Sequence, residues 1–149
     1  MKVDIQKITK HNIKEVLSLS VNSDQEIYIE TTQQCLEDAQ QCKHYQPVAL
    51  YWNDELAGFA MYGLFPGEGR DGRVWLDRFL IDKSFQGRGI GKIMLSNLIE
   101  HLVKIYGCKQ IYLSLYENNQ GALYLYQKFG FQFNGELDIN GERVMVKEV

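Results

Sequence analysis

The sequence is short of cysteine, of long apolar runs and of excess charge of one sign. Its three cysteines are an odd number and no two have C-x-x-C spacing, which argues against a disulfide framework and against a metal site. Free thiols, no secretory signal and no long apolar run predict a cytoplasmic protein. The formal net charge of −3 gives no reason to expect nucleic acid or a membrane as a partner.

The chain also lacks internal repeats, linkers and low-complexity segments. Its 149 residues suffice for one domain with its own core, and we expect residues 1–149 to form that single domain. Hydrophobic residues make up 45% and charged residues 23% of the sequence, which is typical of globular proteins.

Charge is nevertheless unevenly distributed. Residues 21–45 contain five acids and one base, and residues 82–109 contain five bases and two acids. A cationic ligand near the first segment and a phosphate-bearing ligand near the second would fit this pattern. Two solvated helix faces would produce the same pattern, and charge alone favours this interpretation.

Hydrophobic periodicity predicts strands and helices in mixed order. Strands are expected over residues 3–8, 47–52, 56–65, 73–81, 110–115, 131–133 and, at the sheet edge, 142–147. Helices are expected over residues 13–21, 90–106 and 117–129, with a further helical region over 23–43 that breaks near residue 31. This order predicts a mixed sheet with helices on both faces.

The most informative stretch is residues 74–92, VWLDRFLIDKSFQGRGIGK, in which an apolar strand meets a glycine-rich turn that opens a helix. Gly87, Gly89 and Gly91 permit a sharp turn and close approach of a ligand. Free N–H groups at the following helix start favour an anion, which predicts a pyrophosphate site. Neither the dinucleotide pattern GxGxxG nor the P-loop pattern GxxxxGK[ST] is present.

Two motifs give the chain a family resemblance. The segment QGRGIG resembles the Q/R-x-x-G-x-G/A signature of the GNAT superfamily of acetyl-CoA-dependent N-acetyltransferases. Residues 119–131 are similar to that family's NxxAxxLYxKxGF segment. The segments IYIETTQQCLEDA, VWLDRFLID and FQFNGELDINGERVMVKEV further resemble the bacterial spermine/spermidine acetyltransferases within it.

The resemblance implies an α/β (α+β) fold with a mixed, mostly antiparallel sheet of about six to seven strands and about four helices. It also implies that acetyl-CoA is the cosubstrate. The residues expected to bind it are Phe79, Leu80 and Ile81 on the strand, Gln86, Gly87, Arg88, Gly89, Ile90, Gly91 and Lys92 in the turn, and Asn119 and Lys128. Each side chain has an alternative interpretation. Arg88 and Lys92 would simply be solvent-exposed residues at a helix start, and Lys128 an exposed helix lysine. Asn119 would be an ordinary N-cap.

Two residues are candidates for proton transfer. Asp77 is an acid inside an otherwise apolar strand, where burial without a purpose or a partner is costly. The resemblance implies that it is the base that deprotonates the amine; the alternative is a salt bridge to Arg73 or Arg78. Tyr126 stands where the family has the tyrosine that protonates the departing thiolate, and the alternative is core packing.

Selection of the substrate is assigned to the acidic segment before Cys35. Glu26 and Glu30 are spaced to bind the ammonium groups of a polyamine, and Tyr28, Tyr62 or Trp75 would add cation–π contact. For each of these the alternative is an ordinary surface residue.

The predicted function is acetyl transfer to a primary amine of a polyamine. Alternatives are acetylation of an aminoglycoside, another small amine, a protein lysine or an N-terminus, and a non-catalytic acetyl-CoA-binding regulatory module. The resemblance also allows a homodimer completed by the C-terminal strand pair.

Overall fold

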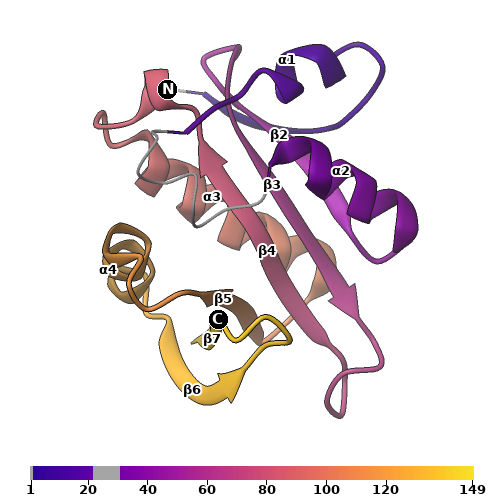
Figure 1. Cartoon of the computed structure of the whole chain (residues 1–149), viewed down its shortest axis with the longest axis vertical. Helices are drawn as coiled ribbons and strands as arrows, with labels where there is room; N and C mark the ends of the chain where they lie inside the picture. The colour runs from indigo at the N-terminus through magenta and orange to yellow at the C-terminus, as the bar shows by residue number, and fades with distance from the viewer. Residues whose placement is uncertain (1, 22–30) are drawn as a thin grey trace.

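The computed structural model describes residues 2–21 and 31–149 (Figure 1). The elements in chain order are β1 (Val3–Lys7), α1 (Ile13–Leu17), α2 (Thr32–Gln41), β2 (Gln46–Trp52), β3 (Glu55–Phe65), β4 (Arg73–Ile81), the 3₁₀ turn η2 (Lys83–Phe85), α3 (Ile90–Tyr106), β5 (Gln110–Leu115), α4 (Gln120–Lys128), β6 (Gln132–Leu137) and β7 (Arg143–Glu148). This order confirms the predicted fold class.

All seven strands join one sheet in the order β1-β2-β3-β4-β5-β7-β6. Every neighbouring pair is antiparallel except β4 and β5, which run parallel. The prediction that the last strand is an edge strand is wrong, because β7 lies between β5 and β6 and makes β6 the outer edge. A hairpin pattern specifies which two strands pair, but it does not say which of them meets the rest of the sheet.

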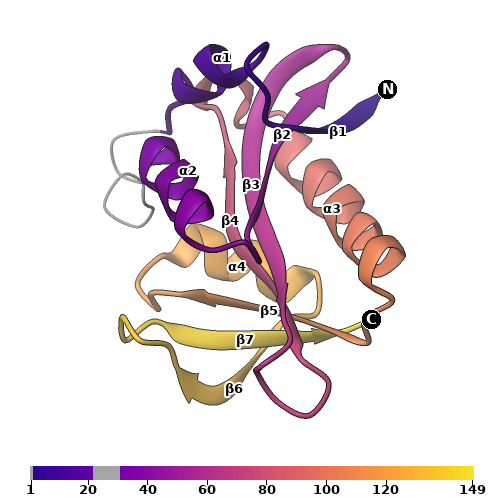
Figure 2. The same ribbon diagram turned by 90° about the vertical axis from the view of Figure 1, so that its right-hand side faces the viewer.

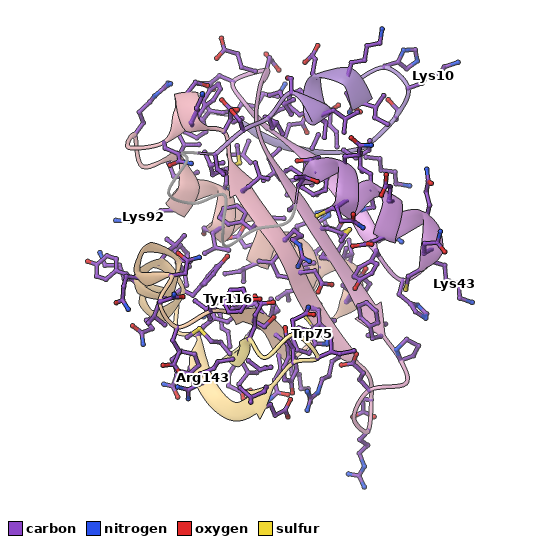
Figure 3. All side chains as sticks on the ribbon, viewed as in Figure 1. Lys10, Lys43, Trp75, Lys92, Tyr116 and Arg143 are labelled. Atoms are coloured by element: carbon purple, nitrogen blue, oxygen red, sulfur yellow. The ribbon has the colours of Figure 1, made fainter. Side chains whose placement is uncertain are left out.

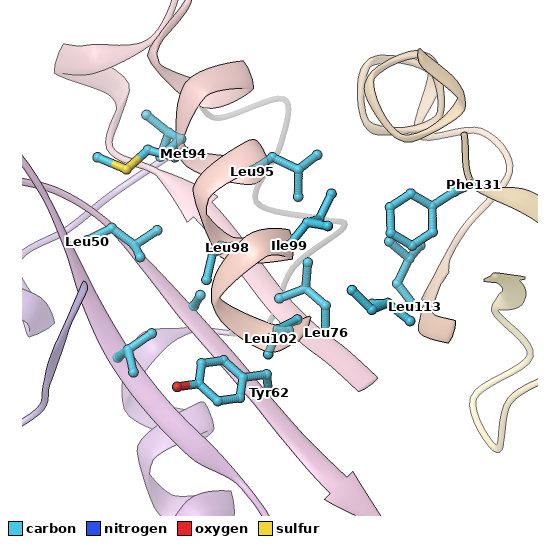
Figure 4. Packing of buried hydrophobic residues seen from close by; sticks show 14 of the residues in the cluster. Leu50, Tyr62, Leu76, Met94, Leu95, Leu98, Ile99, Leu102, Leu113 and Phe131 are labelled. Carbon is cyan, nitrogen blue, oxygen red and sulfur yellow. The ribbon is translucent and has the colours of Figure 1, made fainter. Parts of the chain in front are cut away.

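The helices cover both faces of the sheet, as Figure 2 shows for α1 and α2 on one side of β2–β4 and for α3 on the other. On the α3 side, Met94, Leu98 and Leu102 are buried against strand residues such as Leu50 and Leu76 (Figure 4). A smaller cluster on the other side packs Val16 and Cys35 against residues including Phe59, Met61 and Leu80. No helix in the two described ranges is both long and apolar enough to cross a membrane.

Both ends of α3 lie where the sequence predicts them, and α2 begins at the predicted break near residue 31. Gly107 ends α3 in the left-handed region, with φ 59°, and the Thr31 side chain caps α2 by accepting from the Gln34 N–H. The predicted helix over 13–21 is too long: α1 ends at Leu17, and Ile13 and Leu17 are exposed rather than packed. A single turn makes too few contacts to bury a continuous apolar face.

Candidate active site

A cleft opens where β4 and β5 part. Within the described chain these strands share one ladder pair, Trp75 with Tyr112, and in Figure 2 β5 then runs across the direction of β4. We call the cavity between the end of β4, the glycine-rich turn and α4 the β4–β5 cleft; its volume is about 340 Å³. Its lining residues are Val21, Phe79, Leu80, Ile81, Gln86, Gly87, Gly91, Asn119, Gly121, Ala122, Leu125 and Tyr126.

The glycine-rich turn forms one end of this cleft. Gly87 and Gly89 both have φ 76°, a left-handed conformation that side-chain-bearing residues adopt at a cost. A Cβ on either glycine would meet no atom within 4 Å, so the requirement is conformational rather than steric. The Gln86 side chain fixes the turn by donating from Nε2 to the Ile81 carbonyl oxygen at 2.8 Å.

The start of α3 suits an anion. Its N-cap is Gly89, which has no side chain to cap the first-turn N–H groups. These groups and the helix dipole attract negative charge. Gly91, in the first turn, lines the cleft, and its missing side chain leaves room beside Ile81.

Tyr126 enters the cleft from α4. Its ring packs edge-on against Phe131 at 5.7 Å between centroids, and burial raises the pKa of its hydroxyl to about 12. The hydroxyl therefore stays protonated at neutral pH and can donate. Asn119 lines the same cleft while its Oδ1 accepts from the Ala122 N–H at 3.5 Å, so its side chain is the N-cap of α4.

Other residues predicted to bind the cofactor do not line the cleft. Ile90 is buried in the core, so only its backbone belongs to the turn. Arg88 and Lys92 are exposed at the start of α3, and Lys128 is exposed on α4 (Figure 3 labels Lys92). The Arg88 guanidinium lies 5.3 Å from the Phe85 ring centroid, and the Lys128 ammonium lies 4.9 Å from that of Tyr124.

A second cavity lies against the α2 side of β4, and we call it the acidic cavity. Its volume is about 680 Å³. Six carboxylate residues and two arginines contribute to its lining: Asp38, Glu68, Asp77, Glu136, Asp138 and Glu142, with Arg73 and Arg78. The other lining residues are Gln41, Cys42, Tyr45, Phe65, Trp75, Ser114, Leu137, Ile139, Asn140 and Val144.

Asp77 lines the acidic cavity and lies at a β-bulge of β4. The ladder passes from Met61 opposite Arg78 to Tyr62 opposite Leu76, so Asp77 is the extra residue on β4. The bulge interrupts the strand's alternation, and Asp77 and Arg78 both line the acidic cavity. Arg78 Nη1 donates to the Asp77 carbonyl oxygen at 2.6 Å, and the Asp77 Oδ2 atom is buried.

Hydrogen bonds order the walls of the acidic cavity. Arg73 donates to both carboxylate oxygens of Glu136, at 2.7 and 2.8 Å, and these bonds hold the pKa of Glu136 below its usual value. Trp75 Nε1 donates to Glu68 Oε1 at 2.8 Å. Burial, followed by the negative charge of Asp77, raises the pKa of Tyr45 to about 12.

The residues predicted to bind the substrate do not all lie in the acidic cavity. Glu26, Tyr28 and Glu30 lie outside the described residues. Trp75 does line the acidic cavity, where Figure 3 places it beside the β6–β7 region. The suggestion of Tyr62 is wrong: it is buried on the α3 face, where its hydroxyl lies 3.0 Å from His101 Nε2.

Sequence reasoning missed most of the acidic cavity. Glu68, Glu136, Asp138 and Glu142 come from the β3–β4 loop and the β6–β7 hairpin, which are far apart in the sequence. Asp138 and Glu142 flank the Asn140-Gly141 turn, and no local pattern in the sequence indicates that this turn lies near β4. Of the two alternative salt-bridge partners of Asp77, Arg73 is wrong, because it binds Glu136, and Arg78 stays a prediction.

Comparison with known proteins agrees with this geometry. Residues 13–131 match the Acetyltransferase (GNAT) family. Over 100% of both chains, the sequence is 57% identical to a spermine/spermidine N(1)-acetyltransferase of Bacillus subtilis (strain 168) and to a probable spermine N(1)-acetyltransferase of Bacillus subtilis subsp. natto (strain BEST195). The crystal structure of aminoglycoside acetyltransferase AAC(6')-Ib in complex with coenzyme A has a similar fold, with a TM-score of 0.80, 20% identity and 99% and 95% of the two chains covered. The chain therefore belongs to the GNAT family of acetyltransferases.

Proposed function

We propose that this protein transfers the acetyl group of acetyl-CoA to a primary amine of spermine or spermidine. The observation that carries the proposal is the position of β4, whose residues Trp75, Asp77 and Arg78 line the acidic cavity and whose residues 79–81 line the β4–β5 cleft. A cationic acceptor on the acidic side and an anionic donor on the other would meet at this strand. The full-length similarity to spermine/spermidine acetyltransferases supports the choice of amine.

The residues of the β4–β5 cleft fit acetyl-CoA, which when bound supplies an acetyl thioester. The left-handed turn at Gly87 and Gly89 and the N–H groups at the start of α3 would hold the pyrophosphate. Arg88, Lys92 and Lys128 would add charge at the rim for phosphate oxygens. Beyond Trp75 one edge of β4 separates from β5, which leaves backbone groups of residues 79–81 to bind the pantetheine arm.

Asp77 would act as the general base. An alkylamine comparable to lysine has a pKa of about 10.4, so on the order of one molecule in a few thousand is neutral at pH 7. Asp77 lines the acidic cavity two residues before Phe79 of the β4–β5 cleft. Its carboxylate would take a proton from the ammonium, directly or through water, so that the neutral amine attacks the thioester.

Tyr126 would act as the general acid. Tyr126 lines the β4–β5 cleft and its hydroxyl is protonated at neutral pH, so it would deliver a proton to the sulfur of the leaving thiolate. A backbone N–H of Phe79, Leu80 or Ile81 would stabilise the negative charge that develops on the thioester oxygen.

The acidic cavity would bind the acceptor. Its lining carries more carboxylates than guanidinium groups, which suits a ligand with several ammonium groups. Trp75 offers an aromatic surface to an ammonium or to a methylene chain. As part of this proposal we place the protein in the cytoplasm, because its three cysteines are free thiols.

Thiol release from acetyl-CoA tests the proposal. The purified protein is assayed with spermine, spermidine, putrescine, an aminoglycoside and a lysine peptide. We expect the highest kcat/KM with spermine or spermidine. A higher kcat/KM for the aminoglycoside or the peptide would replace the proposed acceptor, and binding of acetyl-CoA without turnover of any amine would favour a regulatory module.

A further inference from the structure

We propose that Glu68 selects polyamines over monoamines by binding the second ammonium of the acceptor beside Trp75. This inference rests on the proposed function, because it takes the nitrogen to be acetylated as lying at Asp77. It adds a specificity-determining residue from the β3–β4 loop that none of the sequence motifs contains.

The spacing along β4 fits a polyamine. Trp75 and Asp77 are two residues apart and both line the acidic cavity. Two residues of extended strand span about 7 Å. Neighbouring nitrogens of a polyamine are separated by three or four methylenes, about 5 to 6 Å in an extended chain at about 1.25 Å per bond. An acceptor with its reacting nitrogen at Asp77 therefore places its next nitrogen near Trp75.

Glu68 is fixed at that point by the indole of Trp75. Trp75 Nε1 donates to Glu68 Oε1 at 2.8 Å, and the Trp75 ring lies 5.4 Å from that of Tyr112. Tyr112 is held in turn by the Arg73 guanidinium, which lies 4.4 Å from its ring centroid. The carboxylate of Glu68 is therefore positioned by a stack of ordered side chains, although it belongs to a loop.

The hydrogen bond to Glu68 leaves the charge of the carboxylate in place, because the indole N–H is uncharged. Two other acids of the acidic cavity accept more hydrogen bonds from the described residues than Glu68 does. Glu136 receives two hydrogen bonds from the cationic Arg73. Asp138 accepts from the Ser114 hydroxyl at 2.8 Å and from the backbone N–H groups of Asn140 and Glu142 at 2.9 and 2.8 Å. Glu68 thus combines a fixed position with a negative charge beside an aromatic face, the combination that recognises an alkylammonium.

Steady-state kinetics of Glu68→Gln test this assignment. The glutamine oxygen still accepts from Trp75 Nε1, so the variant removes the charge and keeps the hydrogen bond. We expect the KM for spermidine to rise about tenfold, and the KM for 1-aminobutane, which has no second ammonium, to change less than about twofold. The matched control is Glu55→Gln, since Glu55 is an exposed acid in the β2–β3 hairpin and does not line the acidic cavity.

A second variant, Trp75→Phe, tests whether the Glu68 carboxylate must be held in position by Trp75 for its charge to act. In Trp75→Phe the hydrogen bond to Glu68 is lost, so adding Glu68→Gln to it is expected to raise the KM for spermidine less than in the wild-type background. Equal effects of Glu68→Gln on both amines, or no effect on spermidine, would overturn the inference while leaving the proposed function intact. If the wild-type protein turns over 1-aminobutane and no polyamine, the proposed function itself fails.

Discussion

Trp75 and Tyr112 form the one ladder pair between β4 and β5 in the described chain, and their rings lie 5.4 Å apart. The β4–β5 cleft opens directly beyond this pair. Arg73 reinforces the junction by covering the Tyr112 ring and binding Glu136 of β6. The rings of Trp75 and Tyr112 therefore fix the point from which the two strands diverge.

Replacing Tyr112 by alanine should destabilise the protein by about 2 kcal/mol, because the contacts of both Trp75 and Arg73 with its ring are lost. Urea unfolding measures the change. Tyr124→Ala, at a more exposed position on α4, is the matched control and should change stability by less than about 0.5 kcal/mol. Similar losses for both variants would show that Tyr112 has no special role at the junction.

Tyr126→Phe should reduce kcat at least tenfold with little change in the Kd for coenzyme A, because it removes the proton donor and keeps the ring packed against Phe131. Rapid-mixing kinetics and calorimetric titration of coenzyme A provide the two values. Unchanged turnover would exclude Tyr126 as the acid.

Asp77→Asn should reduce kcat/KM for spermidine about a hundredfold at pH 7.5. The ratio of the wild-type kcat/KM to that of Asp77→Asn should shrink toward pH 9.5, because the neutral fraction of the free amine rises about tenfold per pH unit below its pKa. A pH–rate profile of both proteins measures this convergence. Asp71→Asn, an exposed loop acid that does not line the acidic cavity, is the control, and a deficit independent of pH would argue against a base at Asp77.

Gly89→Ala should cost about 1–2 kcal/mol in stability, because φ 76° is unfavourable for alanine even where space is open. The KM for acetyl-CoA should rise as well if the turn binds its pyrophosphate. Gly67→Ala is a suitable control, because a Cβ there also meets no atom within 4 Å but the backbone does not have this positive φ. Thermal unfolding and steady-state kinetics of the pair report the two effects, and equal stability of the two variants would contradict the conformational explanation.

Alkaline pH should destabilise the protein through its buried tyrosines. Burial raises the pKa of Tyr62 and Tyr126 to about 12, against about 10 in an unfolded chain. The folded state retains these protons longer, so their contribution is fully present below about pH 10 and is lost as the pH rises toward 12. Urea midpoints at pH 8, 10 and 11 should fall over this range, with a smaller fall in Tyr126→Phe. An identical fall of the urea midpoint in Tyr126→Phe would show that Tyr126 does not contribute to the loss of stability at alkaline pH.

The local hydrophobic pattern of the sequence was enough to predict much of the fold. The strand over residues 73–81 and the helix over 90–106 have the predicted bounds, because each has a clear apolar period and a glycine or polar turn at its ends. The position of β7 inside the sheet could not be read locally, since it depends on which hairpin strand meets β5. Pattern also missed the bulge at Asp77, which is set by the register with β3.

The sequence likewise predicted one part of the candidate site and missed the other. The β4–β5 cleft draws on two contiguous motifs, and eight of its lining residues were predicted: Phe79, Leu80, Ile81, Gln86, Gly87, Gly91, Asn119 and Tyr126. The acidic cavity is assembled from α2, a loop and two hairpin strands whose proximity only tertiary packing creates. Glu68 carried no signal in the sequence, since its environment is made by Trp75, seven residues away along a chain that turns back.

The sharing of β4 by two cavities has an evolutionary consequence. The acidic cavity and the β4–β5 cleft both use this strand, and their remaining walls come from separate elements. If the acidic cavity binds the acceptor as proposed, mutations in the β3–β4 loop, in α2 or in the β6–β7 hairpin would change which amine is acetylated and leave the acetyl-CoA site unchanged. Such modularity would let a single scaffold diversify in its targets while its chemistry stays the same.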